Sequence, residues 1–333
     1  MRTQVSIHMK RIPSLIFSFS FFLLLSVSFL ISCQQEQNTT FPEEAARQDS
    51  LALHVGVMPV MDCLPIYYAQ QTDLFNEQGV DVRLRDYLSQ MDADTALQRG
   101  WVEIAYTDVI RSLQMKEDVR VVMGLPCKHS LVTARSKRIR QLKHLNERMV
   151  ALDRLSMSDY WSDEAMLKGG LEQTSIYRPQ INDIQLRLSM LSEQLVDAAL
   201  LPEPYATQAI MKGNRCIFTS NDSSLTLACM TIRKNVLTDT MRMAQIRKFF
   251  KAYNCAVDQL NGEKCRHEIV RNIFRGQYAL PDEVIDSLKL PVFRHARMPL
   301  NKDIDVAAQW LQSRERPIGK IRRDSILCNS FIL

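Results

Sequence analysis

The side chains best suited to binding chemistry are carboxylates, hydroxyls and aromatic rings that follow short apolar runs. Carboxylates accept hydrogen bonds or balance a cation, and aromatic rings stack on planar groups or face a cation. Arg111 is the one base near these positions, so the set would repel an anion more than attract it. The set contains Met58, Asp62, Ser89, Asp92, Tyr106, Thr107, Asp108, Ser156, Ser158, Tyr160, Trp161, Glu203 and Tyr205.

Alternating strand and helix patterns position the first half of this set. The apolar run Leu51–Met58 and the alternating run Val80–Leu84 predict strands, as does Trp101–Tyr106. Pro65 suits the first turn of a helix, and Ala93–Arg99 predicts a second helix that Gly100 ends. This alternation predicts an α/β fold with a parallel sheet and right-handed crossovers.

Ligands of such sheets bind outside the carboxyl ends of the strands. That rule selects three turns, Met58–Leu64, Ser89–Asp92 and Tyr106–Asp108. Short polar residues at helix starts are also common N-caps, so any single one is better explained as a cap. The set as a whole favours a site, because all its members map to strand ends.

The second half of the chain repeats the pattern. Ser156 and Ser158 lead into a helix that runs to Leu167. We expect the chain to cross between two lobes near residues 124–132 and 219–230, and we expect the C-terminal part to be mostly helical. Further strands are predicted at Val119–Leu125, His129–Ala134, Met149–Asp153, Ile184–Leu188, Ala198–Leu201 and Cys216–Thr219. Helices are predicted at Met190–Val196, Val236–Leu260, Glu268–Phe274, Asp282–Leu288 and Lys302–Leu311.

Glu203 allows two interpretations. It ends a predicted strand, where a ligand cation or amide could meet it, and Pro204 then presets the first turn of a helix. Its carboxylate could equally cap that helix and contact no ligand.

Composition excludes several classes of function. The net charge of +5 includes three N-terminal bases, Arg2, Lys10 and Arg11, so the remainder carries only +2 and does not suggest a nucleic-acid partner. The seven cysteines beyond Cys33 form no CxxC pair, so we expect no metal site. No GxGxxG or Walker loop occurs, and we expect no cofactor.

The N-terminus predicts export. A basic head is followed by an apolar run over residues 12–31 and then by Leu30-Ile31-Ser32-Cys33, which resembles a bacterial lipobox. We interpret residues 1–32 as a signal peptide, Cys33 as the lipidation site that holds the protein at the membrane, and residues 33–50 as a tether. The alternative is a permanent membrane anchor, since about 20 apolar residues can span a bilayer.

Residues 56–112 and Asp197–Thr207 resemble the type II periplasmic binding proteins of ABC importers. The resemblance is to the branch that binds nitrate, sulfonates and thiamine-precursor pyrimidines, and the second match is to its "EP(F/Y)A" signature. The matching residues in the first stretch are Gly56, Val57, Pro65, Tyr67, Ala69, Leu74, Phe75, Gly79, Val80, Val82, Ala96, Leu97, Gly100, Glu103, Ala105 and Asp108.

The resemblance implies two Rossmann-like lobes with a hinge and a ligand cleft between them. Lobe 1 would comprise residues 51–126 and 227–333, and lobe 2 residues 127–226. It also implies a monomer on the periplasmic side of a bacterial membrane that delivers a small molecule to an ABC permease.

The acids and rings of the set favour a planar neutral or cationic ligand, such as a thiamine-precursor pyrimidine. A sulfonate- or nitrate-type anion is the alternative ligand.

An enzyme on the same fold would need a nucleophile–base pair in the cleft, and no histidine lies in a predicted turn. His267 and Glu268 begin an HExxH-like pattern, but Arg271 stands where the second histidine would be. A surface lipoprotein that binds a protein or a polymer and a sensor are further alternatives on this fold.

Overall fold

The structure is a computed structural model that describes residues 47–115, 118–314 and 326–331. The predicted signal peptide, the lipidation site Cys33 and most of the predicted tether lie outside this part of the chain. The described residues divide into two units, the helical residues 47–51 and the residues from Ala52 onward. Within the described residues, no helix combines the length and the apolar composition that a membrane span requires.

The first sheet contains β1 (Leu53–Val57), β2 (Val82–Asp86), β3 (Ile104–Asp108), β4 (Val119–Leu125) and β10 (Ala228–Arg233). Its strand order is β2-β1-β3-β10-β4. Strand β1 pairs in parallel with β2 and β3, as predicted. The later strand β10 runs antiparallel to both β3 and β4, so the complete sheet is mixed. The chain returns from the second sheet to the end of this sheet where β3 and β4 finish. Strand β10 therefore runs in the direction opposite to theirs.

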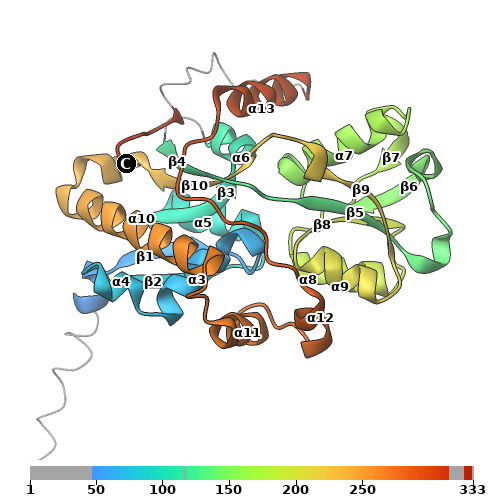
Figure 1. The fold of residues 1–333 in the computed structure, drawn as a ribbon. Coiled ribbons are helices and arrows are strands. Elements are labelled where there is room, and N and C mark those ends of the chain that lie inside the picture. Colours follow the sequence, from blue (N-terminus) through green and yellow to red (C-terminus); the bar gives the residue numbers. More distant parts are fainter. Residues whose placement is uncertain (1–46, 116–117, 315–325, 332–333) are drawn as a thin grey trace, which may run out of the picture. The chain divides into compact units, whose positions relative to one another are not determined.

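The second sheet contains β5 (His129–Thr133), β6 (Arg148–Ala151), β7 (Ile176–Tyr177), β8 (Ala198–Pro202) and β9 (Arg215–Thr219). Its order is β7-β6-β8-β5-β9, with β6 parallel to its neighbours and β5 antiparallel to β8 and β9. The two sheets lie side by side in Figure 1. Residues 126–128 and 220–227 connect them and fall inside the two predicted crossovers. The lobe boundaries themselves stay a prediction.

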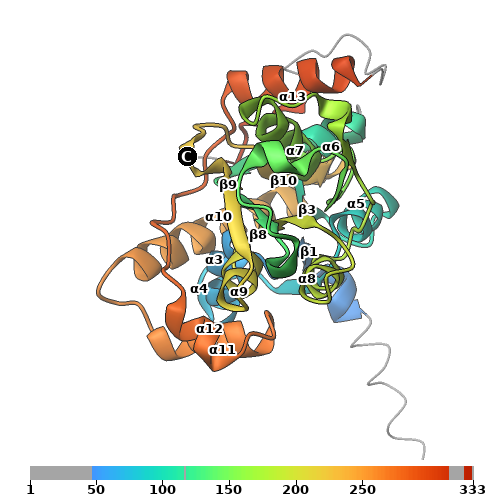
Figure 2. The same ribbon diagram turned by 90° about the vertical axis from the view of Figure 1, so that its right-hand side faces the viewer.

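The helices of the first half are α3 (Leu64–Gln71), α4 (Leu74–Glu77), α5 (Gln90–Arg99), α6 (Val109–Gln114) and α7 (Met157–Lys168). Those of the second half are α8 (Ile184–Ser192), α9 (Tyr205–Met211), α10 (Thr240–Asn261), α11 (His267–Gly276), α12 (Asp282–Ser287) and α13 (Asn301–Ser313). Figure 2 shows α7 on one face of the second sheet and α8 with α9 on the other. Helix α10 packs on α3 and α4, and Phe75 of α4 stacks on Phe249 of α10 at 5.4 Å between ring centroids.

The predicted strand at Ile184–Leu188 was wrong, and so was the predicted start of the next helix at Met190. This stretch is helix α8, which begins after Asp183, whose side chain accepts from Leu186 N. Alternate apolar residues suggested a strand, but Leu186 is 53 % exposed and the buried residues follow helical spacing. The buried face includes Arg187, which an apolar count does not reveal.

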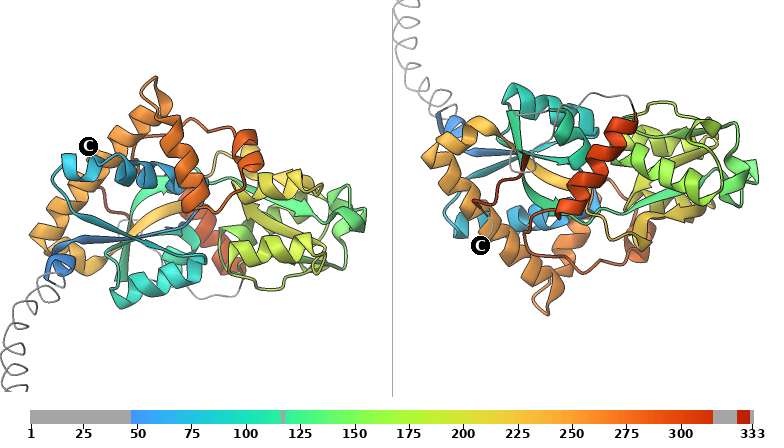
Figure 3. Two further views of the ribbon diagram at one scale, coloured as in Figure 1. Left: turned by 90° about the horizontal axis from the view of Figure 1, so that it is seen from below. Right: turned by 90° about the horizontal axis from the view of Figure 1, so that it is seen from above.

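The C-terminal segment runs past the junction of the two sheets. Helix α12 packs against α9 of the second sheet, and α13 packs against α6 of the first. Between them, Gly124 N at the end of β4 donates to Arg297 O at 2.7 Å. A Cβ at Gly124 would lie 3.1 Å from Pro299 N, so glycine permits this close approach. Figure 3 shows α13 lying across the top of the molecule, between elements of the two sheets.

Candidate ligand cleft

Loops at the carboxyl ends of the first three strands contact elements of the second sheet. After β1, Met61 N donates to Glu203 O at 2.9 Å. After β2, Leu88 O accepts from Ile184 N at 3.2 Å. At the end of β3, Asp108 Oδ2 accepts from Met157 N at 2.9 Å. The strand ends that the sequence selected therefore face the second sheet across a closed cleft.

A cavity of about 20 Å³ lies between these contacts. A water molecule needs roughly 10–15 Å³, so the cavity has room for about one. Met58, Tyr106 and Ser158 of the predicted set line it, and so do residues that the prediction did not include. The full lining is Met58, Val60, Gln90, Tyr106, His129, Asp153, Met157, Ser158, Asn182, Ile184, Arg187 and Pro202.

Asp153 is the buried carboxylate of this cavity. It is 3 % exposed, and neither of its carboxylate oxygens has a hydrogen-bond partner among the described residues. Its backbone is well held, because Asp153 N donates to Ser158 Oγ at 3.0 Å. Burial raises the pKa of this carboxyl, and the charges of Arg111 and Arg187 oppose that rise. Asp153 ends a predicted strand, so the strand-end rule could have selected it.

Two buried bases complete the polar lining. Arg187 is 2 % exposed, and its Nε, Nη1 and Nη2 donate to the carbonyls of Ile181, Leu200 and Asn182. Burial, with Arg187 nearby, lowers the pKa of His129 to about 3. His129 is therefore neutral at physiological pH. The sequence placed it near a crossover and not in the cleft.

A larger pocket of about 650 Å³ adjoins this cavity and contains Asp62 and Glu203 of the predicted set. The hydroxyl of Tyr106 stands between the two, 3.4 Å from Asp62 Oδ2 and 3.6 Å from Cys127 Sγ. Burial raises the pKa of Asp62 to about 6. Glu203 Oε2 accepts from Thr207 N and Thr207 Oγ1, so this carboxylate does cap its own helix while it lines the pocket.

A cysteine and a histidine meet in this region. Cys127 Sγ lies 3.5 Å from His129 Nδ1. An activated pair of this kind has a thiolate beside an imidazolium. Here burial raises the pKa of Cys127 well above its usual value, while the pKa of His129 is low. Both groups are therefore neutral, which makes the thiol a poor nucleophile.

Several predicted site residues make structural hydrogen bonds at or near the starts of helices. Asp108 is fully buried and caps α6 through Arg111 N at 2.7 Å, while Gln90 Nε2 donates to its other oxygen at 2.8 Å. Thr107 Oγ1 donates to Asp94 at 2.5 Å. Ser89 and Ser156 cap α5 and α7, and the exposed Asp92 bonds to Ser89 Oγ.

The remaining predicted aromatics pack within the fold. Tyr160 meets Trp161 edge to face at 5.0 Å and Trp310 at 6.1 Å, and Tyr205 is 1 % exposed. Among the described residues, none of these three rings lines either the small cavity or the larger pocket. Their predicted contact with a ligand stays a prediction.

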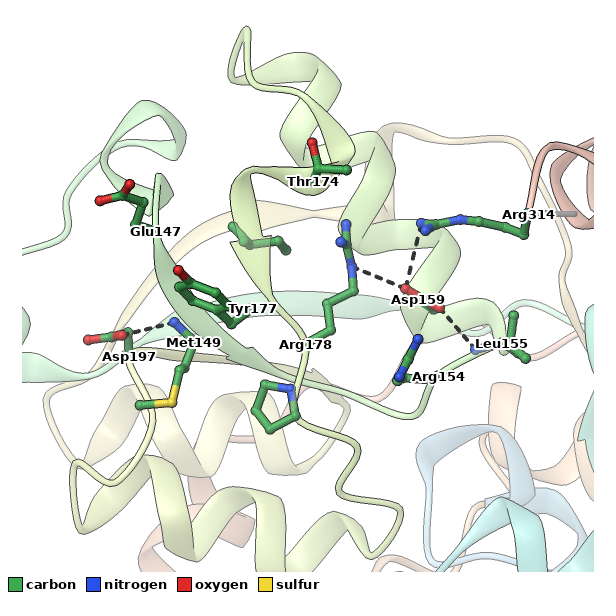
Figure 4. A pocket seen from close by; sticks show the side chains of 12 residues that line it. Glu147, Met149, Arg154, Leu155, Asp159, Thr174, Tyr177, Arg178, Asp197 and Arg314 are labelled. Carbon is green, nitrogen blue, oxygen red and sulfur yellow. Dashed lines mark hydrogen bonds and ion pairs between the residues drawn. The ribbon is translucent and has the colours of Figure 1, made fainter.

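A third hollow, of about 1020 Å³, lies at the β7 edge of the second sheet and contains no residue of the predicted set. Figure 4 shows Arg178 and Arg314 pointing toward Asp159 on its inner side. Arg178 Nε lies 3.2 Å from Asp159 Oδ1, and Arg178 Nη2 lies 2.7 Å from Asp163 Oδ1. These acids and bases neutralise one another, so they form a structural network.

Residues 46–271, more than half of the chain, match the NMT1-like family. The chain belongs to the NMT1-like family. The search of curated proteins found no match. The resemblance stated above to substrate-binding proteins of ABC importers is thereby confirmed at the level of family and fold.

Three solved structures illustrate the shared fold, each at low sequence identity to this chain. The alkanesulfonate-binding protein SsuA of Xanthomonas axonopodis pv. citri, bound to MOPS, has a TM-score of 0.72 at 15 % identity, over 84 % of this chain and 98 % of that one. The periplasmic nitrate-binding protein NrtA of Synechocystis PCC 6803 scores 0.63 at 11 %, over 83 % and 86 %. The Candida albicans CA3427 gene product, described as having the generic periplasmic binding protein fold, scores 0.64 at 14 %, over 84 % and 96 %.

No group of three or more metal-ligating side chains occurs among the residues that the structure describes.

Proposed function

We propose that this protein is an extracytoplasmic solute-binding protein that captures a small molecule between its lobes and delivers it to an ABC import permease. The observation that supports this proposal most strongly is that strand-end loops of both sheets contact one another around a buried polar cavity. Family membership and the named functions of the structural neighbours support the same role.

Capture works by closure. The cavity holds about one water in this closed arrangement, so a ring-sized ligand enters only after the loops separate. Residues 126–128 and 220–227 are the segments about which the lobes would turn. A ligand that contacts both lobes binds the closed form better and shifts the population toward it.

The proposed ligand is a planar neutral or cationic compound, such as a thiamine-precursor pyrimidine. The carboxylates of Asp62 and Asp153 and the ring of Tyr106 support this choice. The alternative is a sulfonate- or nitrate-type anion, which the names of two structural neighbours and the buried Arg187 favour.

The lipid on Cys33 would keep the protein near its permease on the periplasmic side of the membrane. We propose that it acts there as a monomer and without catalysis. The neutral state of Cys127 and His129 supports the absence of a catalytic nucleophile.

A thermal-shift panel on the full-length chain in detergent tests the binding function. The panel contains 4-aminopyrimidine and thiamine, methanesulfonate and nitrate, bicarbonate, and amino acids. A ligand of the native state raises the unfolding midpoint as its concentration increases. A shift with an aminopyrimidine supports the proposed ligand, while a shift with an anion alone keeps the function and replaces the ligand. A flat response to every compound contradicts the solute-binding function.

A further inference from the structure

Asp153 is an unusual group for the interior of a protein. Its side chain is 3 % exposed and lines the cleft cavity, yet both carboxylate oxygens lack a hydrogen-bond partner among the described residues. Buried polar groups are nearly always hydrogen-bonded, and an unpaired buried carboxylate is strongly disfavoured. A ligand with matching donors would remove that penalty at the moment of binding.

The neighbouring cations do not fill this role. Arg111 Nη1 lies 3.7 Å from Asp153 Oδ1, beyond hydrogen-bond distance, and its Nε bonds to Asp94 instead. The guanidinium of Arg187 donates to three backbone carbonyls. Both arginines therefore offset the negative charge of Asp153 but donate no hydrogen bond to its oxygens.

The charge count favours a donor over an anion. Asp94, Asp108, Asp153 and Asp183 lie beside Arg111 and Arg187, and His129 is neutral. Asp159 also acts on Asp153, but it is paired with Arg178. When these acids are ionised, their negative charges exceed the positive charges of the arginines. An added anion would increase that excess, and a cation would reduce it.

We infer that Asp153 is the carboxylate that recognises the ligand, and that the ligand presents two adjacent N–H donors to it. This inference rests on the proposed function and narrows its ligand class to amidinium groups and to amino-substituted heterocycles that are protonated on the ring nitrogen beside the amino group. Such groups bond both oxygens of one carboxylate at once, which is the strong bidentate geometry. The ring of Tyr106 and the side chains of Met58 and Met157 supply an apolar surface beside it.

The test compares the full-length chain with Asp153→Asn and with a control, Asp81→Asn, which changes an exposed carboxylate that pairs with Arg83 and lines neither the cavity nor the larger pocket. Affinity is measured by titration calorimetry with acetamidinium and 2-aminopyridinium as donor probes, and with methanesulfonate as the anion probe. We expect Asp153→Asn to weaken binding of the donor probes at least tenfold and Asp81→Asn to change it less than threefold.

A second measurement needs no ligand. Asp153→Asn removes a buried carboxylate that has no hydrogen-bond partner among the described residues and keeps the shape, so the unfolding midpoint of the ligand-free protein should rise. A marked fall would show that the carboxylate has a structural partner and would overturn the inference. Equal affinity of Asp153→Asn and the parent chain for the donor probes would also overturn it, as would binding of methanesulfonate alone. In the last two cases the solute-binding function survives. If no probe and no panel compound binds, the proposed function itself fails.

Discussion

Trp310 Nε1 donates a hydrogen bond of 2.7 Å to Asp163 Oδ2 and thereby ties helix α13 to helix α7. Asp163 is 3 % exposed and also bonds to Arg178 and Arg314. Because α13 packs on α6 of the first sheet and α7 packs on the second, this contact joins elements of the two sheets. The right-hand view of Figure 3 shows this bridging position.

Replacing Trp310 by Phe should destabilise the protein by about 1.5–3 kcal/mol, the range for a hydrogen bond to a charged group. The phenyl ring keeps an aromatic contact with Tyr160. The free energy of unfolding is measured by urea denaturation. Gln309→Ala, on the exposed side of the same helix, is the control and should change little. Equal stability of the two variants would show that the bridge contributes nothing.

Asp62→Asn should stabilise the protein at neutral pH but not in acid. The pKa of Asp62 is raised from 3.8 to about 6 in the fold, so between these values the native state binds more protons than the unfolded state. The free energy of unfolding therefore falls as pH rises from about 4 to 6. The full shift corresponds to at most about 3 kcal/mol, and screening at this half-buried group reduces it to about 1 kcal/mol.

The effect of Asp62→Asn is the difference in the free energy of unfolding between the variant and the parent chain at each pH. This difference removes the contribution of His129, which is uncharged in the fold because its pKa is near 3. The protein therefore loses stability through His129 as pH falls below about 6.5, which is the opposite slope to that of Asp62. Urea midpoints at pH 4 and pH 7.5 suffice. A variant equally displaced from the parent chain at both pH values would contradict the assigned titration.

Cys127 should react slowly with iodoacetamide at pH 7.5, at least tenfold slower than a free cysteine. Burial raises its pKa well above the ordinary value, so little thiolate is present. Its rate should keep rising up to pH 9.5, whereas that of free cysteine levels off near its pKa of about 8.5. Peptide mass spectrometry resolves Cys127 from the exposed Cys216. Fast labelling at pH 6 that His129→Asn abolishes would indicate an activated pair and favour an enzyme.

Asp108→Ala should destabilise the protein by about 2–4 kcal/mol. It removes the N-cap of α6 and the bond from Met157 N across the cleft, and it leaves Gln90 Nε2 without this partner. Asp92→Ala changes an exposed carboxylate near the start of α5 and serves as the control, with an expected loss under about 1 kcal/mol. Thermal unfolding of both variants is the readout. Similar losses would show that burial does not distinguish the two acids.

Local sequence pattern predicted the first three strands and the helices between them. Each apolar run there is short and bounded by a turn signal, so the period is unambiguous. Asp108 was a strand-end residue and a possible cap from the sequence, and the structure shows that it caps α6. The reversed direction of β10 was not predictable in this way, because it depends on how the chain returns from a distant sheet.

The cleft was harder to predict than the fold. Asp153 ends the predicted strand Met149–Asp153 and so met the strand-end rule, but the predicted set contained only Ser156 and Ser158 from this turn. Arg187 was hidden by the mistaken strand at Ile184–Leu188. Its guanidinium donates to the carbonyls of Ile181, Asn182 and Leu200, which lie in the loop before α8 and in β8. Hydrogen bonds from a side chain to backbone carbonyls leave no residue pattern, so one sequence does not reveal such a buried base.

Hydrogen exchange at the amides of Met61, Met157 and Ile184 tests capture by closure most directly, because each donates a bond across the cleft. Exchange would be followed by mass spectrometry on the full-length chain with each panel compound, and peptides from α11 would serve as the reference. We predict that the ligand slows exchange at all three amides together and leaves α11 unchanged. A compound that raises the unfolding midpoint without slowing these amides would contradict closure of the two lobes around a ligand.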